Sequence, residues 1–499
     1  MDTGYNSLRN RAKTLGVVMI LMNVIRQCLL RPARMAGCIT LCFSALAFTG
    51  LANAETVSFV QAWQQLQQVS DHLQAKSQHV NRAKAEEHAG DALNYPSLNI
   101  AGSYTRLEKP IELDLQDLNP LASLDASSLP SAITEVLATI PSSMYVTPFT
   151  EQDVFRASLQ AMWPIYTGGR ITAAQGMHAA QVSESEQEFA LASRELFLQL
   201  VDRYYAVSVT HTLADTQQQL VDSLSLHVSH AEKLEQQGQI AKVERLNAQV
   251  ALENAKVDLG KAKRQYEMAE IALARMLHVP TVSPNTPLFV LKQQPSLSRL
   301  SQLTLTQHPA LKLLEAKEAQ ANGLVDLEKG GYFPTVYLYG NYTLYEDDSL
   351  FSQVEPDWMV GVGVSIPLIS RDGRSSKVLA AKSALLQARY TKAQTKQDLS
   401  LLIDQSYRQM LQAQEEVEAL NTSLSLATEN LRLRELAFNQ GLSTSIDRVD
   451  AELNLTAVKT KQLGAKYRYM QAYAKVMAVS GQVDEYINRI EIQGASHAN

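Results

Sequence analysis

The chain repeats itself after about two hundred residues, and this internal repeat constrains its fold more than any other feature. At a constant offset of 203 positions, the segment EQQGQIAKVERLNAQVALENAK of the first half aligns with FNQGLSTSIDRVDAELNLTAVK of the second. The clearest aligned pairs are Pro164 with Pro367, Tyr204 with Tyr407, Gly238 with Gly441 and Arg245 with Arg448. Upstream, NYPSLNIAGSYTRL returns as GYFPTVYLYGNYTLY. A repeat of this length indicates one structural unit that is used twice.

Residues 1–54 have the features of an export signal. Basic residues precede an apolar run from Ala36 to Leu51, and the run ends in Ala-Asn-Ala before Glu55, as in a cleavage site. The segment is long for a signal peptide. Translation from an internal methionine (Met19, Met22 or Met35) and an uncleaved membrane anchor are therefore alternatives.

The cysteines and the net charge narrow the class of protein. Cys28, Cys38 and Cys42 all lie in this leader, so the exported chain is expected to fold without disulfides. Cys38 as a lipid-attachment site is an alternative. The leader holds six of the 45 basic residues and one of the 51 acids, so its removal leaves a formal net charge of −11. Such a charge disfavours nucleic acid as a partner.

Four short segments alternate between apolar and polar residues, at about 98–107, 154–163, 335–345 and 358–367. In the last of them Trp358, Val360 and Val362 share one face. Outer-membrane barrels use strands of roughly 9–11 residues with this alternation and with interfacial aromatic residues. A half-buried soluble sheet gives the same pattern. No stretch after Leu51 approaches the roughly 18–20 apolar residues of a membrane helix, so insertion into a membrane would require strands.

Two very long helices are predicted, because residues 170–236 contain no proline and residues 374–440 contain neither proline nor glycine. Each run has 67 residues and would span roughly 100 Å at 1.5 Å per residue. Such lengths indicate a coiled coil or a helical tube rather than a globular domain. Gly238 and Gly441 are expected to turn each long helix back as an antiparallel hairpin.

The predicted organisation is a leader, two repeats and a tail. The first repeat, 55–300, contains the strands at 98–107 and 154–163, an extracellular insertion at 108–153, the helices 170–236 and 241–277, and an irregular linker at 278–300. The second repeat, 301–480, contains the strands at 335–345 and 358–367 and the helices 374–440 and 445–478. Residues 481–499 are expected to form a C-terminal tail that is loose after about Ile490.

No motif for an enzyme, a cofactor or a phosphate group is present. His227 and His230 are spaced for one helix face, with Glu232 nearby. They could hold a metal ion, but a solvated helix face is the favoured interpretation. The sequence therefore predicts no catalytic residues, no cofactor and no metal site.

The acidic residues beside the two turns carry the main functional hypothesis. Asp447 and Asp450 share one face of the helix after Gly441, and Glu244 and Asn247 take the equivalent places in the first repeat. A solvated helix face would explain this spacing. If several copies surrounded an axis, however, each aspartate would form a ring of like charge, which selects for cations and narrows a bore. Four strands do not close a barrel, so several chains would have to contribute strands.

The order of these features resembles the TolC family of outer-membrane efflux proteins over residues 56–480. The resemblance rests on the duplicated strand–long helix–Gly turn–helix order and on Pro164 and Pro367, each followed by GGR or DGR at a strand-to-helix junction. It also rests on the duplicated turn element QGQIAKVERLNAQ and QGLSTSIDRVDAE.

The resemblance implies a homotrimer that is mainly helical. Three chains would supply a 12-stranded outer-membrane β-barrel that continues as a periplasmic α-helical barrel with coiled-coil hairpins. A periplasmic adaptor would dock at the hairpin tips, Gly238 and Gly441, and an inner-membrane pump of the RND, ABC or MFS type would supply the energy. The protein would lie in the lipid of the outer membrane and give passive export.

The resemblance also implies roles for single residues. Asp447 and Asp450 match the acidic constriction rings, and Glu244 matches an acid that latches the hairpins. This chain has Phe438 and Ser443 where that latch uses a tyrosine and an arginine, so we expect a different latch. Type I protein secretion is an alternative function, and a periplasmic coiled-coil scaffold that never enters the membrane is another.

Overall fold

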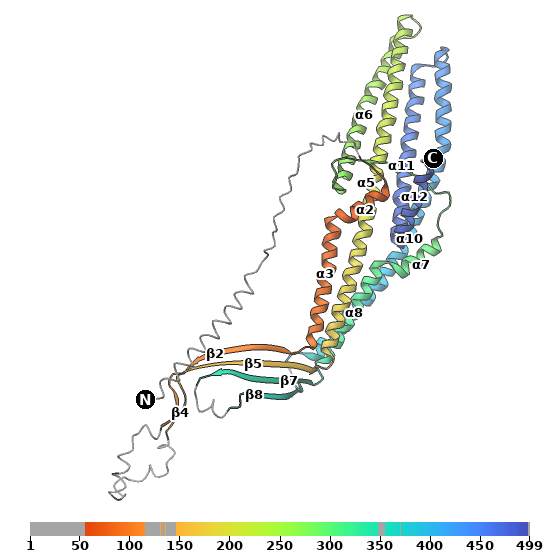
Figure 1. Ribbon diagram of the computed structural model, residues 1–499. Helices are drawn as coiled ribbons and strands as arrows, with labels where there is room; N and C mark the ends of the chain where they lie inside the picture. Colours follow the sequence, from red (N-terminus) through yellow and green to blue (C-terminus); the bar gives the residue numbers. More distant parts are fainter. Residues whose placement is uncertain are drawn as a thin grey trace. The chain divides into compact units, whose positions relative to one another are not determined.

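The two sequence repeats form two copies of one arrangement of helices and strands (Figure 1). The first copy contains α2 (Phe59–Val69), α3 (Asp71–Asp91), β2 (Ser97–Arg106), β5 (Asp153–Tyr166), α5 (Arg170–Gln236) and α6 (Lys242–Met276). The second contains α7 (Leu297–Gln307), α8 (Pro309–Gly330), β7 (Thr335–Glu346), β8 (Trp358–Ser365), α10 (Arg374–Asn439) and α11 (Ser445–Ser480). The long helices have 67 and 66 residues, and the helices that follow them have 35 and 36.

The computed structural model describes residues 55–114, 130, 135, 146–347, 355–369 and 371–497. The predicted leader, with its cysteines, lies outside the described residues. The predicted insertion 108–153 lies partly outside them. Its described part contains β3 (Ile111–Asp114), which pairs antiparallel with β4 (Val146–Thr150).

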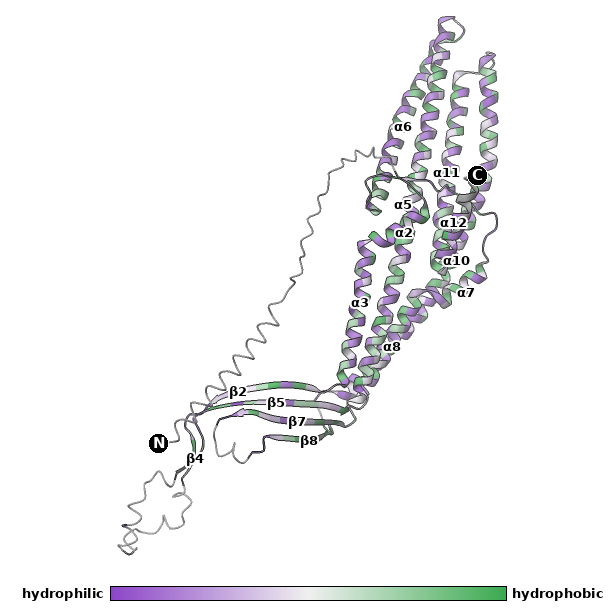
Figure 2. Cartoon of the chain, in the orientation of Figure 1, coloured by the Kyte–Doolittle hydropathy of each residue, from purple (hydrophilic) through white to green (hydrophobic). Residues whose placement is uncertain are grey.

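The sheet has the order β2-β5-β7-β8, and all neighbouring strands are antiparallel. Its register sorts the side chains into two faces. One cross-strand row joins Ile100, Leu159, Tyr342 and Trp358, while the next row joins Asn99, Gln160, Asn341 and Met359. The apolar face is open to its surroundings, with Ile100 67% exposed and Val360 72% exposed. The other face holds a depression of about 600 Å³ whose lining includes Ser103, Arg156 and Ser158. Hydrophobic and hydrophilic residues are interspersed along the helices (Figure 2).

The two prolines predicted to mark the strand-to-helix corners differ in position: Pro164 lies inside β5, and Pro367 lies in the corner before α10. Pro164 pairs with Tyr337 inside β5, so this strand continues to Tyr166 instead of ending at 163. The sheet tolerates the proline because its register shifts beside it. Pro367 lies two residues beyond the end of β8. There the guanidinium of Arg374 donates to the carbonyls of Pro367 (3.0 Å) and Gly331 (3.2 Å), which fixes the start of α10.

The main core is an aromatic cluster around the middle of the long helices. Phe59 of α2 contacts the rings of Phe197, Tyr204 and Tyr205 of α5 and of Tyr486. All five side chains are fully buried. The Tyr486 ring belongs to α12 (Val483–His497), which also buries Ile490. The prediction of a loose tail after about Ile490 is wrong, because α12 continues to His497, and Tyr486 and Ile490 earlier in this helix are buried.

The predicted irregular linker 278–300 also contains regular structure. β6 (Val282–Pro284) pairs in parallel with β1 (Glu55–Val57), and α7 begins at Leu297. The hydroxyl of Tyr204 fixes this pair, because it donates to the carbonyl of Val57 (2.8 Å) and accepts from the N–H of Thr286 (3.0 Å). Burial raises the pKa of Tyr204, so this hydroxyl keeps its proton at neutral pH.

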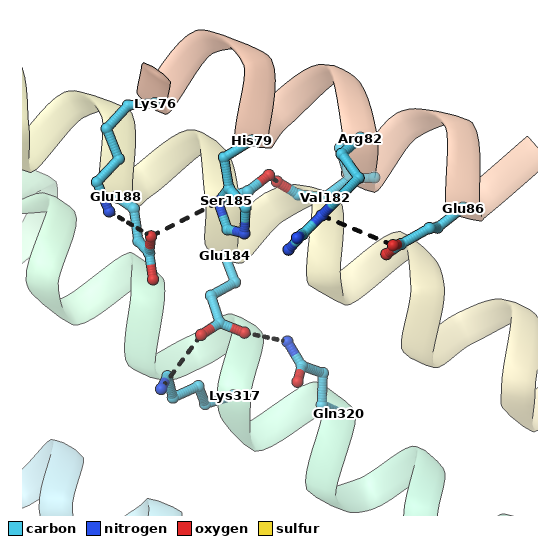
Figure 3. A network of polar contacts seen from close by, with 10 residues as sticks. All are labelled: Lys76, His79, Arg82, Glu86, Val182, Glu184, Ser185, Glu188, Lys317 and Gln320. Atoms are coloured by element: carbon cyan, nitrogen blue, oxygen red, sulfur yellow. Dashed lines mark hydrogen bonds and ion pairs between the residues drawn. The ribbon is translucent and has the colours of Figure 1, made fainter. Parts of the chain in front are cut away.

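A polar network binds α3 and α8 to opposite sides of α5 (Figure 3). Glu184 of α5 is only 8% exposed, and its carboxylate accepts from Gln320 (2.6 Å) and pairs with Lys317 (3.1 Å) of α8. Glu188, one turn further along α5, accepts from Lys76 of α3 (2.8 Å). This hydrogen bond lowers the pKa of Glu188. Because one helix thus holds a helix of each repeat, the network joins the two copies.

Candidate functional site

The two predicted hairpin turns have the same backbone structure. Gly238 follows α5 with φ +71°, and Gly441 follows α10 with φ +73°. In the first turn the N–H of Gln239 donates to the carbonyl of Leu234, and in the second the N–H of Leu442 donates to that of Ala437, both at 2.8 Å. Such bonds close a helix end through a left-handed residue, which glycine adopts without strain. The turns therefore hold α6 and α11 antiparallel to the long helices.

Asp447 is engaged in capping its own helix. Its Oδ2 accepts from the backbone N–H of Thr444 (3.1 Å), from the Thr444 hydroxyl (2.8 Å) and from the Ser443 hydroxyl (3.0 Å). In return the N–H of Asp447 donates to the Thr444 hydroxyl (3.2 Å), so the two residues form a capping box. These bonds, led by the Thr444 backbone N–H, lower the pKa of Asp447. The carboxylate is thus ionised and held at the helix end.

Asp450 lies one turn further along α11 and differs from Asp447. It is exposed, and its side chain has no hydrogen bond or ion pair with the described residues. The predicted pair of aspartates therefore shares a helix, but only Asp450 has a freely solvated carboxylate.

Glu244 caps the helix of the other repeat. Its Oε2 accepts from the backbone N–H of Ser445, the first residue of α11, at 3.0 Å. The N-cap of its own helix α6 is Ala241, which has no side chain that could accept a hydrogen bond. Anionic groups are stabilised at a helix N-terminus, where backbone N–H groups are unpaired. Glu244 therefore joins the hairpin of repeat one to the hairpin of repeat two, without contacting Ser443.

His227 lies in the same contact between the hairpins. It is 2% exposed, and its Nε2 lies 2.7 Å from the hydroxyl oxygen of Ser445. Its ring packs edge-to-face with the ring of Phe438, with 4.9 Å between the ring centroids. Burial, followed by the charges of Arg448 and His230, lowers the pKa of His227 from 6.5 to about 4. The imidazole is therefore neutral at pH 7.

The expectation of a solvated helix face is wrong for His227, since two helices of the other hairpin cover it. It holds for His230, which is exposed. Phe438 and Ser443 are the two residues that differ from the latch of the resembled family. Phe438 contacts the ring of His227, and the Ser443 hydroxyl donates to Asp447.

Arg448 adds a buried charge to this contact. Its Nη2 donates to Glu435 of α10 (2.8 Å) and to the hydroxyl of Ser223 of α5 (3.3 Å), and it lies 3.8 Å from Glu452. The Ser223 hydroxyl donates in turn to Glu452 (2.8 Å). Arg448 is 7% exposed and Glu452 8%. The equivalent Arg245 of repeat one donates to Glu235 and Gln249, which both belong to its own hairpin.

We call these side chains the inter-repeat contact: Ser223, His227, Glu244, Phe438, Ser445, Arg448 and Glu452. The sequence alone did not assign Ser223, Ser445, Arg448 or Glu452 to a site. A signal for Asp447 was available, because Thr444-Ser-Ile-Asp447 has the spacing of a capping box.

The described residues contain no group of three side chains that could hold a metal ion. Over the same part of the chain, no helix has both the length and the apolar character needed to cross a membrane.

Comparisons with known structures identify the fold. CusC, which forms a transmembrane channel, superposes with a TM-score of 0.68 at 16% identity, over 90% of this chain and 99% of CusC. VceC, an outer membrane protein of Vibrio cholerae, superposes with a TM-score of 0.68 at 14% identity, over 85% of this chain and 96% of VceC. At these identities the likeness concerns the fold alone.

Comparisons of sequence identify the family. The protein CyaE of Bordetella pertussis is 26% identical over 232 residues, which are 44% of this chain and 48% of CyaE, so the match spans about half of that protein. The profile of the outer membrane efflux protein family matches residues 62–278 and 300–482, which is most of the chain. The chain therefore belongs to the outer membrane efflux protein family, as a non-enzymatic protein of the outer membrane.

Proposed function

We propose that three copies of this chain form one continuous export duct, which receives its substrates from an energised inner-membrane pump through a periplasmic adaptor. The observation that carries the proposal is the alternation of apolar and polar rows across the four-stranded sheet. A sheet with one apolar and one polar face suits a wall with lipid on one side and a water-filled bore on the other.

The strand edges require that several copies of the chain assemble. Among the described strands of this sheet, β2 and β8 each have a neighbour on one side only. Unpaired backbone groups are too costly for a lipid environment, so the edges must pair with other chains. Cyclic symmetry joins β8 of one copy to β2 of the next. Three copies of the four strands would give the 12 strands that the family resemblance implies.

The hairpin ends are the proposed docking sites for the adaptor. Leu442, next to the Gly441 turn, is 77% exposed, and Ile446 and Val243 are about half exposed. Exposed apolar side chains at the end of a hairpin suit a helical partner that buries them. The Gly238 and Gly441 turns would carry these side chains to the adaptor.

Membrane fractionation, gel electrophoresis and conductance in planar bilayers test whether the chain forms a trimeric duct. The full-length protein should fractionate with the outer membrane and run as a trimer that heating converts to a monomer. It should also form channels in planar bilayers. A monomer without conductance would contradict the proposal. Crosslinking in cells followed by purification should recover an adaptor and a pump, and the identity of the pump would assign the substrate class, including proteins exported by type I secretion.

Asp450 is the proposed selectivity residue, and Asp447 supplies a matched control. A unit charge about 8 Å from a permeating cation contributes about 0.5 kcal/mol in water. The same charge repels an anion, so Asp450→Asn in three copies should lower the cation-to-anion permeability ratio by about tenfold or more. Asp447→Asn should weaken the start of α11 while changing this ratio far less, because the guanidinium of Arg434, 3.6 Å away, already compensates the charge of the Asp447 carboxylate. Reversal potentials in a salt gradient measure the ratio. An equal effect of both substitutions would contradict the assignment.

A further inference from the structure

His227 is a buried titratable group at the only place where the described hairpin ends of the two repeats exchange side-chain hydrogen bonds. We propose that acid opens the inter-repeat contact, with His227 as the group that takes up the proton. The inference rests on the proposed function, a duct whose hairpin ends carry the predicted constriction. It adds a regulatory input to this duct, a response of the constriction to the pH of the periplasm.

The geometry favours a neutral imidazole. His227 is enclosed by α5, α10 and α11, and its polar partner from the other hairpin is the hydroxyl of Ser445, which is itself 1% exposed. A hydroxyl group carries no charge that could compensate an imidazolium. An uncompensated ion in such a site is strongly disfavoured. Protonation of His227 therefore acts against the packed arrangement.

The surrounding charges reinforce this preference, and the nearby carboxylates are already engaged. The charged or titratable groups that face the contact from α5, α6, α10 and α11 are His230, Glu244, Glu435, Arg448 and Glu452. Glu435 and Glu452 pair with Arg448, and Glu244 accepts from the N–H of Ser445. The guanidinium of Arg448 repels a second positive charge on His227.

The direction of the pH effect follows from linkage. In the packed contact the pKa of His227 is about 4, whereas an imidazole exposed by separation of the hairpins has the ordinary value of 6.5. The stabilisation that His227 gives to the packed state is thus complete above pH 6.5 and is lost as the pH falls from 6.5 toward 4. Between pH 8 and pH 5.5 the ratio of packed to open hairpins should fall by about tenfold for each chain.

Planar bilayers with the full-length channel test the inference. Acid is added on the side that carries the hairpins, and the open probability is recorded from pH 8 to pH 5. Wild type should open more often as the pH falls. His227→Gln, whose amide can still bond to Ser445 but does not titrate, should give a much flatter response. His230→Gln is the matched control, because His230 lies one turn away on the same helix and is exposed; it should behave as wild type.

Two outcomes would overturn the inference: the same acid response in His227→Gln as in wild type, or loss of the response in His230→Gln. The matched pair also separates the effect of His227 from that of the aspartates of α11, which are unchanged in His227→Gln. If neither wild type nor any variant conducts ions, the proposed function as a duct is contradicted. The inference is then tested by a second measurement that does not depend on ion conduction.

This second measurement is the accessibility of a buried thiol. Ala231 lies on α5 one turn from His227 and is fully buried. Its replacement by cysteine provides a reporter, and the alkylation rate is compared at each pH between the wild-type and His227→Gln backgrounds, so that the thiolate fraction cancels. The ratio of wild-type to variant rates should rise by about tenfold between pH 8 and pH 5.5. A ratio that does not change with pH would overturn the inference.

Discussion

Phe59→Ala should destabilise the folded chain by about 3–5 kcal/mol, the range found when a buried phenylalanine is truncated. The Phe59 ring is fully buried and lies 5.3–6.0 Å from four other aromatic rings on α5 and α12. Its removal would leave a cavity where α2, α5 and α12 meet. The measurement is the denaturant midpoint of the detergent-solubilised protein, together with its resistance to trypsin.

Phe59→Leu is the matched control for this cavity. Leucine keeps much of the apolar volume, so the loss should stay below about 1.5 kcal/mol. Because α12 closes the same cluster through Tyr486, the alanine variant should also become sensitive to trypsin near the C-terminus. An alanine variant as stable as the leucine variant would contradict the assignment of this cluster as the main core.

Arg448→Ala should have the second large effect, a loss of about 3–5 kcal/mol, because it leaves the buried carboxylate of Glu452 without its counter-charge. Arg448 also bonds to Ser223 of the other repeat, so the hairpins should separate more easily. We expect a lower denaturant midpoint and, in bilayers, a larger open probability at pH 8.

Two variants make this result interpretable. Arg245→Ala removes the equivalent arginine of repeat one, which is more exposed and contacts only its own hairpin, so its effect should be about 1 kcal/mol or less. Combining Arg448→Met with Glu452→Leu removes both buried charges and should recover most of the lost stability. Failure of this double variant to recover stability would show that shape, and not the uncompensated charge, determines the effect.

The elements that were predicted correctly have strong local signals. Helices α5 and α10 were predicted to within one residue, because no proline interrupts them and a glycine with positive φ lies in the turn that follows each helix. The four strands were found from their alternation. Their faces were also predicted, because a period of two fixes which residues share a side.

The features that were missed depend on contacts between distant parts of the chain. β1 and β6 have three residues each, and only their mutual pairing makes them strands. α12 is short, and its place in the core depends on Phe59 and the tyrosines of α5. The burial of His227 depends on the other hairpin, which lies more than two hundred residues away in the sequence. No pattern within one helix carries that information.

The one-sided cap by Glu244 makes the two repeats mechanically unequal. Glu244 holds α11, but no described residue of the second repeat caps α6 in the same way, because Asp447 caps its own helix. In the proposed trimer the six hairpins would meet at two kinds of junction, one within each chain and one between chains. Only the junction within a chain contains Glu244, His227 and Ser445 together. A stimulus that acts on these residues would loosen the three junctions within chains and leave the three junctions between chains intact. The ring of six hairpins would then widen at three places while the subunits stay joined.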